Sequence, residues 1–132
     1  MKLELKHLAG YLPYGLKAEF ADYDDIEDIE ILTILSLEIG SEEDFIVNQY
    51  SSFFFQFKPI LRPLSDLTKE IEVNGEKFVP KDWLNYNFIG ENMGLNIATW
   101  SHRTIEKLYE WHFDIHGLIE NGLAIDINTI NL

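Results

Sequence analysis

The sequence predicts a single α+β domain over residues 1–132, with an antiparallel sheet and one main C-terminal helix packed on it. Between residues 15 and 79, short apolar or alternating segments are separated by turn-forming residues, which is typical of strands. From Ser101 to Gly122 the apolar residues instead recur at helical spacing, leaving one face to bury. With 132 residues, 46% of them hydrophobic, the chain is long enough to form one core without disulfides.

The first third of the chain predicts two strands. Residues 1–17 indicate a short strand or helical turn, followed by a turn at Leu12–Gly15. Alternation over 16–20 predicts a first strand, which a polar connection through Asp25 ends. Residues 29–35 would place apolar side chains on both faces of a strand, so we expect a strand that is covered on both sides or contacts another chain.

A second apolar run, from Phe45 to Leu61, contains Phe53, Phe54, Phe55 and Phe57. Such a run is an aggregation hazard when exposed, so we expect it either in the centre of the sheet or in an oligomer interface. Pro59 and Pro63 are expected to close it, and Ser65-Asp66 to cap one or two helical turns.

The remaining elements follow from local signals. Asn74-Gly75 lies between two short alternating segments and predicts a hairpin over 71–79 with a type I′ turn. Pro80 predicts the start of a helical turn, and residues 85–96 a loop. The main helix is expected over 102–120, ended by Asn121-Gly122, and a short strand over 123–128 completes the sheet.

The charge balance restricts the partners. The formal net charge is −13, from 23 acidic and 10 basic residues. Binding to phosphates requires Lys and Arg in a patch, so we expect neither direct nucleic-acid binding nor attachment to anionic membranes. No apolar run reaches the roughly 18 residues of a membrane span, and cysteine is absent. A cytoplasmic protein, without signal peptide or membrane span, is expected.

The acidic residues are concentrated in one part of the chain, because no Lys or Arg occurs between Lys17 and Lys58. We hypothesise that they dock on a basic partner; the alternative is a solvated surface that keeps an apolar sheet soluble. Asp22 and Asp24 match an EF-hand loop only in part, since Ile26 stands at its third ligand position. The candidate partner-binding residues are Asp22, Asp24, Asp25, Glu27, Asp28, Glu30, Glu42, Glu43 and Asp44.

His112 and His116 stand four residues apart on the predicted helix, a spacing that allows two histidines to share a metal ion. The zinc-protease signature needs a glutamate where Phe113 stands, so the favoured interpretation is a hydrogen-bonded core histidine at His112. His116 is expected at the edge of the apolar face, where Glu120 can pair with it. Neither a serine nucleophile elbow nor a phosphate loop occurs, and we expect no catalytic residue, metal or cofactor.

Three segments resemble a group of small uncharacterised proteins from phages and prophages of Bacteroidetes-type bacteria: LKHLAGYLPYGLK, FKPILRPLSDLTKEIEVNGEKFVPKDWL and LYEWHFDIHGLIENGLAIDIN. The resemblance implies a phage origin and carries over no catalytic residues. We therefore expect a phage-encoded, non-enzymatic protein that docks on a basic host protein, such as a nucleic-acid-handling defence factor, as an anti-CRISPR or DNA-mimic protein would. The alternatives are an oligomeric phage assembly or accessory protein and a metal-dependent enzyme using His112 and His116.

Overall fold

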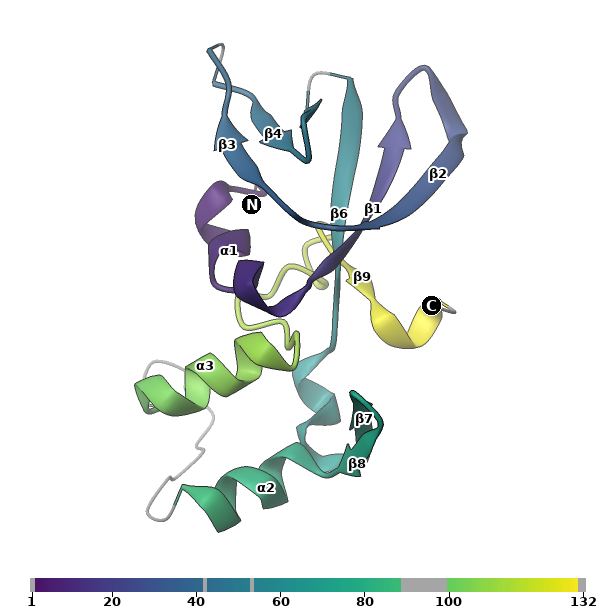
Figure 1. Ribbon diagram of the computed structural model, residues 1–132. Coiled ribbons are helices and arrows are strands. Elements are labelled where there is room, and N and C mark those ends of the chain that lie inside the picture. Colours follow the sequence, from purple (N-terminus) through teal and green to yellow (C-terminus); the bar gives the residue numbers. More distant parts are fainter. Residues whose placement is uncertain (1, 42, 53, 89–99, 131–132) are drawn as a thin grey trace.

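The computed structural model describes residues 2–41, 43–52, 54–88 and 100–130. Within them the fold is α+β, with strands in more than one sheet rather than one sheet under one helix (Figure 1). The four-stranded sheet has the order β2-β1-β6-β9. Its strands are β1 (Lys17–Asp22), β2 (Asp25–Thr33), β6 (Phe55–Leu61) and β9 (Ile125–Asp126).

Two smaller sheets accompany it. One consists of β3 (Leu37–Ile39), β4 (Phe45–Val47) and β5 (Tyr50–Ser51). The other is the hairpin of β7 (Ile71–Val73) and β8 (Glu76–Phe78). The helical elements are α1 (Leu5–Ala9), η1 (Leu12–Tyr14), η2 (Leu64–Thr68), α2 (Pro80–Asn87), α3 (His102–Glu110) and η4 (Ile127–Thr129).

The main sheet is antiparallel except at β9, which pairs in parallel with β6 through Ile60 and Ile125. The prediction of a wholly antiparallel sheet is therefore wrong at this strand. The connection from β6 to β9 is long enough to return the chain to the start of a parallel strand, which a short hairpin turn cannot do. The last strand is also shorter than the predicted 123–128, because the chain turns into η4 at Ile127.

The predicted alternation of the first strand is confirmed, since Leu16, Ala18 and Phe20 are buried. Phe20 meets the buried Phe57 of β6 edge to face, with ring centroids 4.8 Å apart. These side chains form the sheet core, together with Leu8 and Tyr11 from the N-terminal segment and others. The short α1 and the turn through η1 and Gly15 (φ 67°) agree with prediction.

β2 is the edge strand of the main sheet, and its predicted cover on both sides is wrong. Ile29 and Ile31 are paired with Ala21 and Glu19 on the outward face and are 47% and 40% exposed. Apolar residues at both parities indicated burial, but within the described chain no element lies beyond β2 in the sheet. An exposed edge strand of this kind offers free backbone groups for pairing.

The apolar run from Phe45 to Leu61 is divided between the hairpin of β4 and β5 and the strand β6. β6 is central in the main sheet, which is one of the two predicted alternatives, with Phe57 buried and Phe55 half-buried. Phe54 precedes the strand and is 64% exposed, and Phe53 lies outside the described residues. Upstream, the sequence did not reveal the hairpin of β4 and β5, whose turn residues Asn48 and Gln49 have φ of 52° and 71°.

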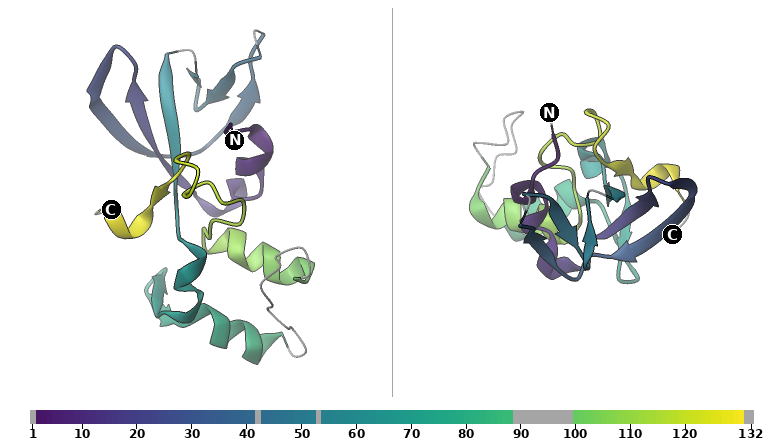
Figure 2. Two further views of the ribbon diagram at one scale, coloured as in Figure 1. Left: turned by 180° about the vertical axis from the view of Figure 1, so that it is seen from behind. Right: turned by 90° about the horizontal axis from the view of Figure 1, so that it is seen from above.

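A second cluster, the helical core, joins Ile71, Leu84, Leu108, Trp111 and Phe113. The elements β7, α2 and α3, which contribute to it, lie below the main sheet in Figure 1 and in the left view of Figure 2. The predicted hairpin over 71–79 is confirmed, with φ of 52° at Asn74 and 84° at Gly75. The start of α2 at Pro80 is also confirmed. Part of the predicted loop at 85–96 belongs to α2, and the rest, beyond Phe88, lies outside the described residues.

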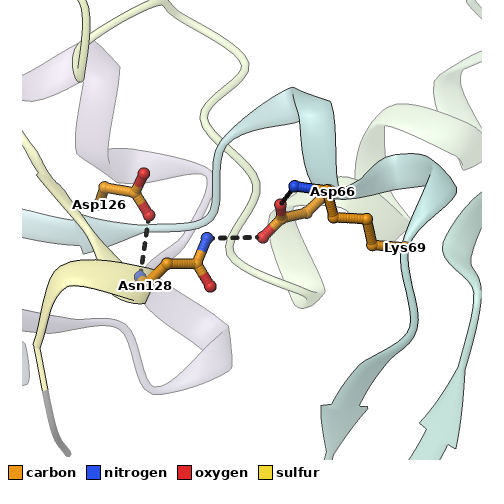
Figure 3. Close-up of polar contacts among 4 residues, drawn as sticks. All are labelled: Asp66, Lys69, Asp126 and Asn128. Carbon is orange, nitrogen blue, oxygen red and sulfur yellow. Dashed lines mark hydrogen bonds and ion pairs between the residues drawn. The ribbon is translucent and has the colours of Figure 1, made fainter.

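The predicted cap at Ser65-Asp66 is wrong, because η2 follows Pro63 without a side-chain cap. Asp66 is instead buried and holds the C-terminal segment (Figure 3). Its Oδ2 accepts a hydrogen bond from the Asn128 side chain at 2.9 Å, and the Lys69 ammonium lies 3.6 Å from its Oδ1. The Asn128 backbone N–H donates to the Asp126 side chain at 2.9 Å, so η2 is linked to η4.

The predicted helix over 102–120 is too long, since α3 ends at Glu110. After Trp111, His112 adopts a left-handed φ of 63° and the chain pairs with Arg62. Arg62 N–H donates to the His112 carbonyl at 2.7 Å, and Asp114 N–H donates to the Arg62 carbonyl at 2.8 Å. This pairing replaces the next helical turn. Consequently α3 packs in the helical core instead of covering the main sheet.

The segment after this break is organised by the buried Asp114. Its carboxylate accepts hydrogen bonds from the backbone N–H groups of Leu118 and Ile119, both at 2.9 Å. Gly122 has the predicted positive φ, 72°, but it ends a turn rather than a long helix. The apolar residues that suggested one helix face therefore lie partly in a turn-rich segment, from which Trp111 and Leu118 are still buried in the protein.

The fully buried Tyr11 connects the N-terminal segment to this break. Its hydroxyl donates to the Phe113 carbonyl and accepts from Ile115 N–H at 3.3 Å. Burial raises the pKa of Tyr11 far above its usual value. Both observations indicate a neutral phenol that fixes the path of the chain after α3.

We predict that Tyr11→Phe lowers the free energy of unfolding by about 1–2 kcal/mol, because it leaves buried backbone groups without this partner. Tyr86→Phe is the matched control, since Tyr86 is 84% exposed on α2. Urea unfolding followed by circular dichroism measures both. Equal stability of the two variants would contradict the role assigned to the Tyr11 hydroxyl.

Candidate functional site

The predicted acidic residues are divided between two hairpins. Six of them, Asp22, Asp24, Asp25, Glu27, Asp28 and Glu30, belong to the hairpin of β1 and β2, here called the acidic hairpin. Glu43 and Asp44 lie in the turn between β3 and β4, and Glu42 lies outside the described residues. Figure 1 shows the two hairpins rising on opposite sides of the start of β6.

The face on which each acid lies follows from the strand register. In an antiparallel sheet, directly paired residues direct their side chains to the same face. Asp22 is paired with Phe55, and Glu30 with Phe20, so both acids share the face that carries the phenylalanines. The register shifts near Asp22, and the other acids cluster at this end of the hairpin.

A cleft of about 800 Å³ lies on that face. Phe55 and Phe57 of β6 line it together with Phe45 of β4 and Leu123, which gives it apolar walls. We call it the acid-rimmed cleft, because carboxylates from separate parts of the chain also line it. Its lining residues are Lys2, Leu3, Glu4, Leu5, Tyr23, Ile39, Glu43, Asp44, Phe45, Ser52, Phe55, Phe57 and Leu123.

Large apolar side chains are exposed around this cleft. Tyr23, in the turn of the acidic hairpin, is 55% exposed, and Ile39 of β3 is 54% exposed. Tyr23 N–H donates to the Phe54 carbonyl at 3.0 Å, which places the exposed Phe54 beside the same turn. Exposed apolar side chains grouped in this way are typical of surfaces that bind another molecule.

Several of the acids also stabilise the turns in which they lie. Asp22 Oδ1 accepts from Asp24 N–H at 2.9 Å, and Asp25 Oδ1 accepts from Glu27 N–H at 3.3 Å. In the other hairpin, the Ser51 hydroxyl donates to Asp44 Oδ2. These contacts give Asp22, Asp25 and Asp44 a structural role in addition to their charge.

The charge of the acidic hairpin is not neutralised within the described chain, where none of its six acids forms an ion pair. The ion pairs found among the described residues lie elsewhere, as in Lys6–Glu4 at 3.1 Å and Lys107–Glu110 at 2.8 Å. Neighbouring carboxylates repel each other, so a positively charged partner would relieve that repulsion.

His112 and His116 both follow the end of α3 at Glu110, so they do not share a helix face, and the predicted helical spacing for a common metal ion is lost. His112 Nε2 lies 2.7 Å from the Tyr14 carbonyl oxygen, and His116 Nε2 lies 3.1 Å from the Tyr109 hydroxyl. Among the described residues, no group of three or more His, Cys, Asp or Glu side chains is placed to hold a metal ion.

Burial lowers the pKa of both histidines. For His112 desolvation is the main cause, and the positive charge of Arg62 adds to it, while the bond to the Tyr14 carbonyl opposes it. For His116 desolvation acts together with the nearby His7 and Lys6, and Asp114 opposes them. His7 and His116 have ring centroids 5.3 Å apart, so protonation of both rings would bring like charges together.

Sequence reasoning found the acids and the phenylalanine run as separate features but missed the cleft that joins them. Tyr23 and Ile39 were not identified, since an isolated tyrosine and an isolated isoleucine carry no signal of their own. The only usable signal was that an acidic stretch and an aromatic run lie within about 35 residues of each other in the sequence. The pairing of β1 with both β2 and β6 makes them neighbours in space.

Comparison with protein-family models, with curated proteins and with solved structures gave no match. None of the described helices combines the length and the apolar character that crossing a membrane requires.

We predict that the free energy of unfolding falls as the pH is lowered from 7.5 to 5. The folded-state pKa values of His112 and His116 lie below the usual 6.5, so the unfolded chain binds more protons in this range. Urea unfolding at several pH values measures the effect. His116→Gln should reduce the pH dependence relative to His102→Gln, which replaces an exposed histidine of α3. The same pH dependence in both variants would contradict this assignment.

Proposed function

We propose that this protein is a non-enzymatic binding protein that docks on a basic protein partner through the acidic hairpin and the acid-rimmed cleft. The observation that carries the proposal is the register of the main sheet. It places Asp22 and Glu30 on the same face as the phenylalanines of β1 and β6. Charge and apolar contact surface are thereby combined on one face.

The two features suggest different parts of the recognition. Unpaired carboxylates attract a basic surface over a distance and favour fast association, an effect that salt weakens. The apolar lining of the cleft, with Phe55 and Phe57, suits an aromatic or aliphatic anchor of the partner. We therefore expect the partner to present an apolar side chain flanked by Lys or Arg.

The biological setting of the proposal rests on the resemblance to phage and prophage proteins. A phage protein with this surface would act in the bacterial cytoplasm on a basic host protein. A nucleic-acid-handling defence factor is the partner class we propose, because its own ligand is a polyanion that carboxylates can imitate. Inhibition would follow from occupation of the nucleic-acid site, as for an anti-CRISPR or DNA-mimic protein.

We predict that replacing Asp24, Asp25, Glu27 and Asp28 by Lys abolishes co-purification of the partner from a bacterial lysate. The matched control reverses Glu70, Glu76, Asp82 and Glu120, which are exposed on other elements and give the same change in net charge. The partner should be released from the wild-type protein as salt is raised. Equal capture by both variants would sink the docking hypothesis, because the position of the charges would then be irrelevant.

We predict that Tyr23→Ser weakens binding of that partner by about tenfold or more, since Tyr23 is an exposed aromatic side chain at the edge of the cleft. Tyr86→Ser on α2 is the control, because Tyr86 is more exposed and does not line the cleft. Isothermal titration calorimetry measures both affinities. An unchanged affinity for Tyr23→Ser would show that the partner does not reach the cleft.

Self-association is a second candidate, favoured by the exposed Ile29 and Ile31 on the edge strand β2. Two such edges can pair to extend the sheet, which suits an assembly or accessory protein. The central position of β6 does not favour the Phe53–Phe57 run as the interface. Sedimentation of the wild-type protein over a range of concentrations tests this candidate, and a constant monomer mass would exclude it.

A further inference from the structure

A second cavity, of about 570 Å³, lies where η1, β6, β7 and the end of α3 meet. We call it the Arg62 pocket. It shares no lining residue with the acid-rimmed cleft. Its walls carry both charged and aromatic side chains, among them Tyr14, Lys17, Arg62, Glu72, Trp111 and His112.

Arg62 is held in this pocket with part of its guanidinium free. Its Nε donates to the Trp111 carbonyl at 3.3 Å, and its charge lies 5.9 Å from the centre of the Phe113 ring. Within the described chain, the terminal nitrogens donate to no other group and no carboxylate forms an ion pair with them. Burial lowers the pKa of Arg62, and only Asp66 opposes this effect.

The backbone around Arg62 is fixed, so the side chain is presented from a rigid base. Its N–H and carbonyl are both used in the pairing with His112 and Asp114. His112 adopts a φ of 63° in this pairing, in the left-handed region that residues other than Gly occupy only occasionally, although His, like Asn and Asp, is found there more often than most. Strained backbone of this kind occurs disproportionately at binding sites.

The charges that line the pocket suit an anion with a single charge. Lys17 and Arg62 contribute two positive charges, in a chain that has few. Glu110 is already bound to Lys107 at 2.8 Å, and Asp66, which acts on Arg62 from outside the lining, has the Lys69 ammonium 3.6 Å from its Oδ1. Glu72 is therefore the competing negative charge in the lining. A monoanion balances the remaining positive charge, whereas a phosphate dianion would exceed it.

We propose that the Arg62 pocket binds the carboxylate of a small organic acid. The planar guanidinium can donate two parallel hydrogen bonds to a carboxylate, and Lys17 supplies a second positive charge. Trp111, Tyr14 and Val73 provide a surface for an apolar or flat body attached to that carboxylate. The ligand class is therefore an apolar monocarboxylate, bound independently of any protein partner at the cleft.

The test is a titration of the isotope-labelled protein, followed by NMR, with benzoate, with its neutral analogue benzamide and with inorganic phosphate. Benzoate is expected to shift the amide signals of Lys17, Arg62 and His112. Benzamide and phosphate are expected to bind at least about tenfold more weakly, since a charge-assisted pair is lost or mismatched. Equal binding of benzoate and benzamide, or tighter binding of phosphate, would overturn the proposal.

Variants locate the effect. Arg62→Gln should weaken benzoate binding by about tenfold or more, and Arg103→Gln, which removes a positive charge that stacks on Phe88 instead, should not. Lys17→Gln changes an exposed side chain and keeps the test valid if Arg62→Gln does not fold. The site would be refuted if Lys17→Gln bound benzoate with wild-type affinity and Arg62→Gln either did the same or failed to fold.

Discussion

The backbone of Arg62 pairs with the chain at His112–Asp114, and the rest of the structure depends on this contact. It joins the end of β6 to the end of α3, and therefore the sheet core to the helical core. The Tyr11 hydroxyl bonds to the same segment and brings the N-terminal elements to it. Because this pairing ends α3, it also sets the positions of His112, Asp114 and Arg62. The Arg62 pocket is a direct consequence.

Charge is distributed unevenly over this framework. The base-free stretch between Lys17 and Lys58 forms the sheets that flank the cleft, whereas most Lys and Arg residues follow it in sequence. Unpaired carboxylates on one hairpin reduce stability through mutual repulsion, and the turn-capping contacts of Asp22 and Asp25 offset part of that cost. The two proposed sites use opposite charges: the cleft suits a cation-bearing protein, and the pocket suits a small anion.

Local signals in the sequence determined several elements correctly. Asn74-Gly75 specified its hairpin, Pro80 the start of α2, and the alternation from Leu16 to Phe20 the first strand. Each depends on backbone preferences or side-chain periodicity within a few residues, which long-range contacts did not override. The sequence likewise showed that the acidic residues are concentrated between Lys17 and Lys58, because the position of each charge along the chain can be read directly from it.

Tertiary structure alone decided where those elements go. Helical periodicity continued past Glu110, but the chain there forms hydrogen bonds to Arg62 in place of the next helical turn. Arg62 precedes His112 by 50 residues in the sequence. Apolar side chains on both faces indicated that β2 is buried, yet the strand order places β2 at the edge of the main sheet. The cleft and the Arg62 pocket combine residues distant in sequence, so no local pattern could reveal them. Periodicity reports which residues tend to be buried, whereas strand pairing and chain path decide what they are buried against.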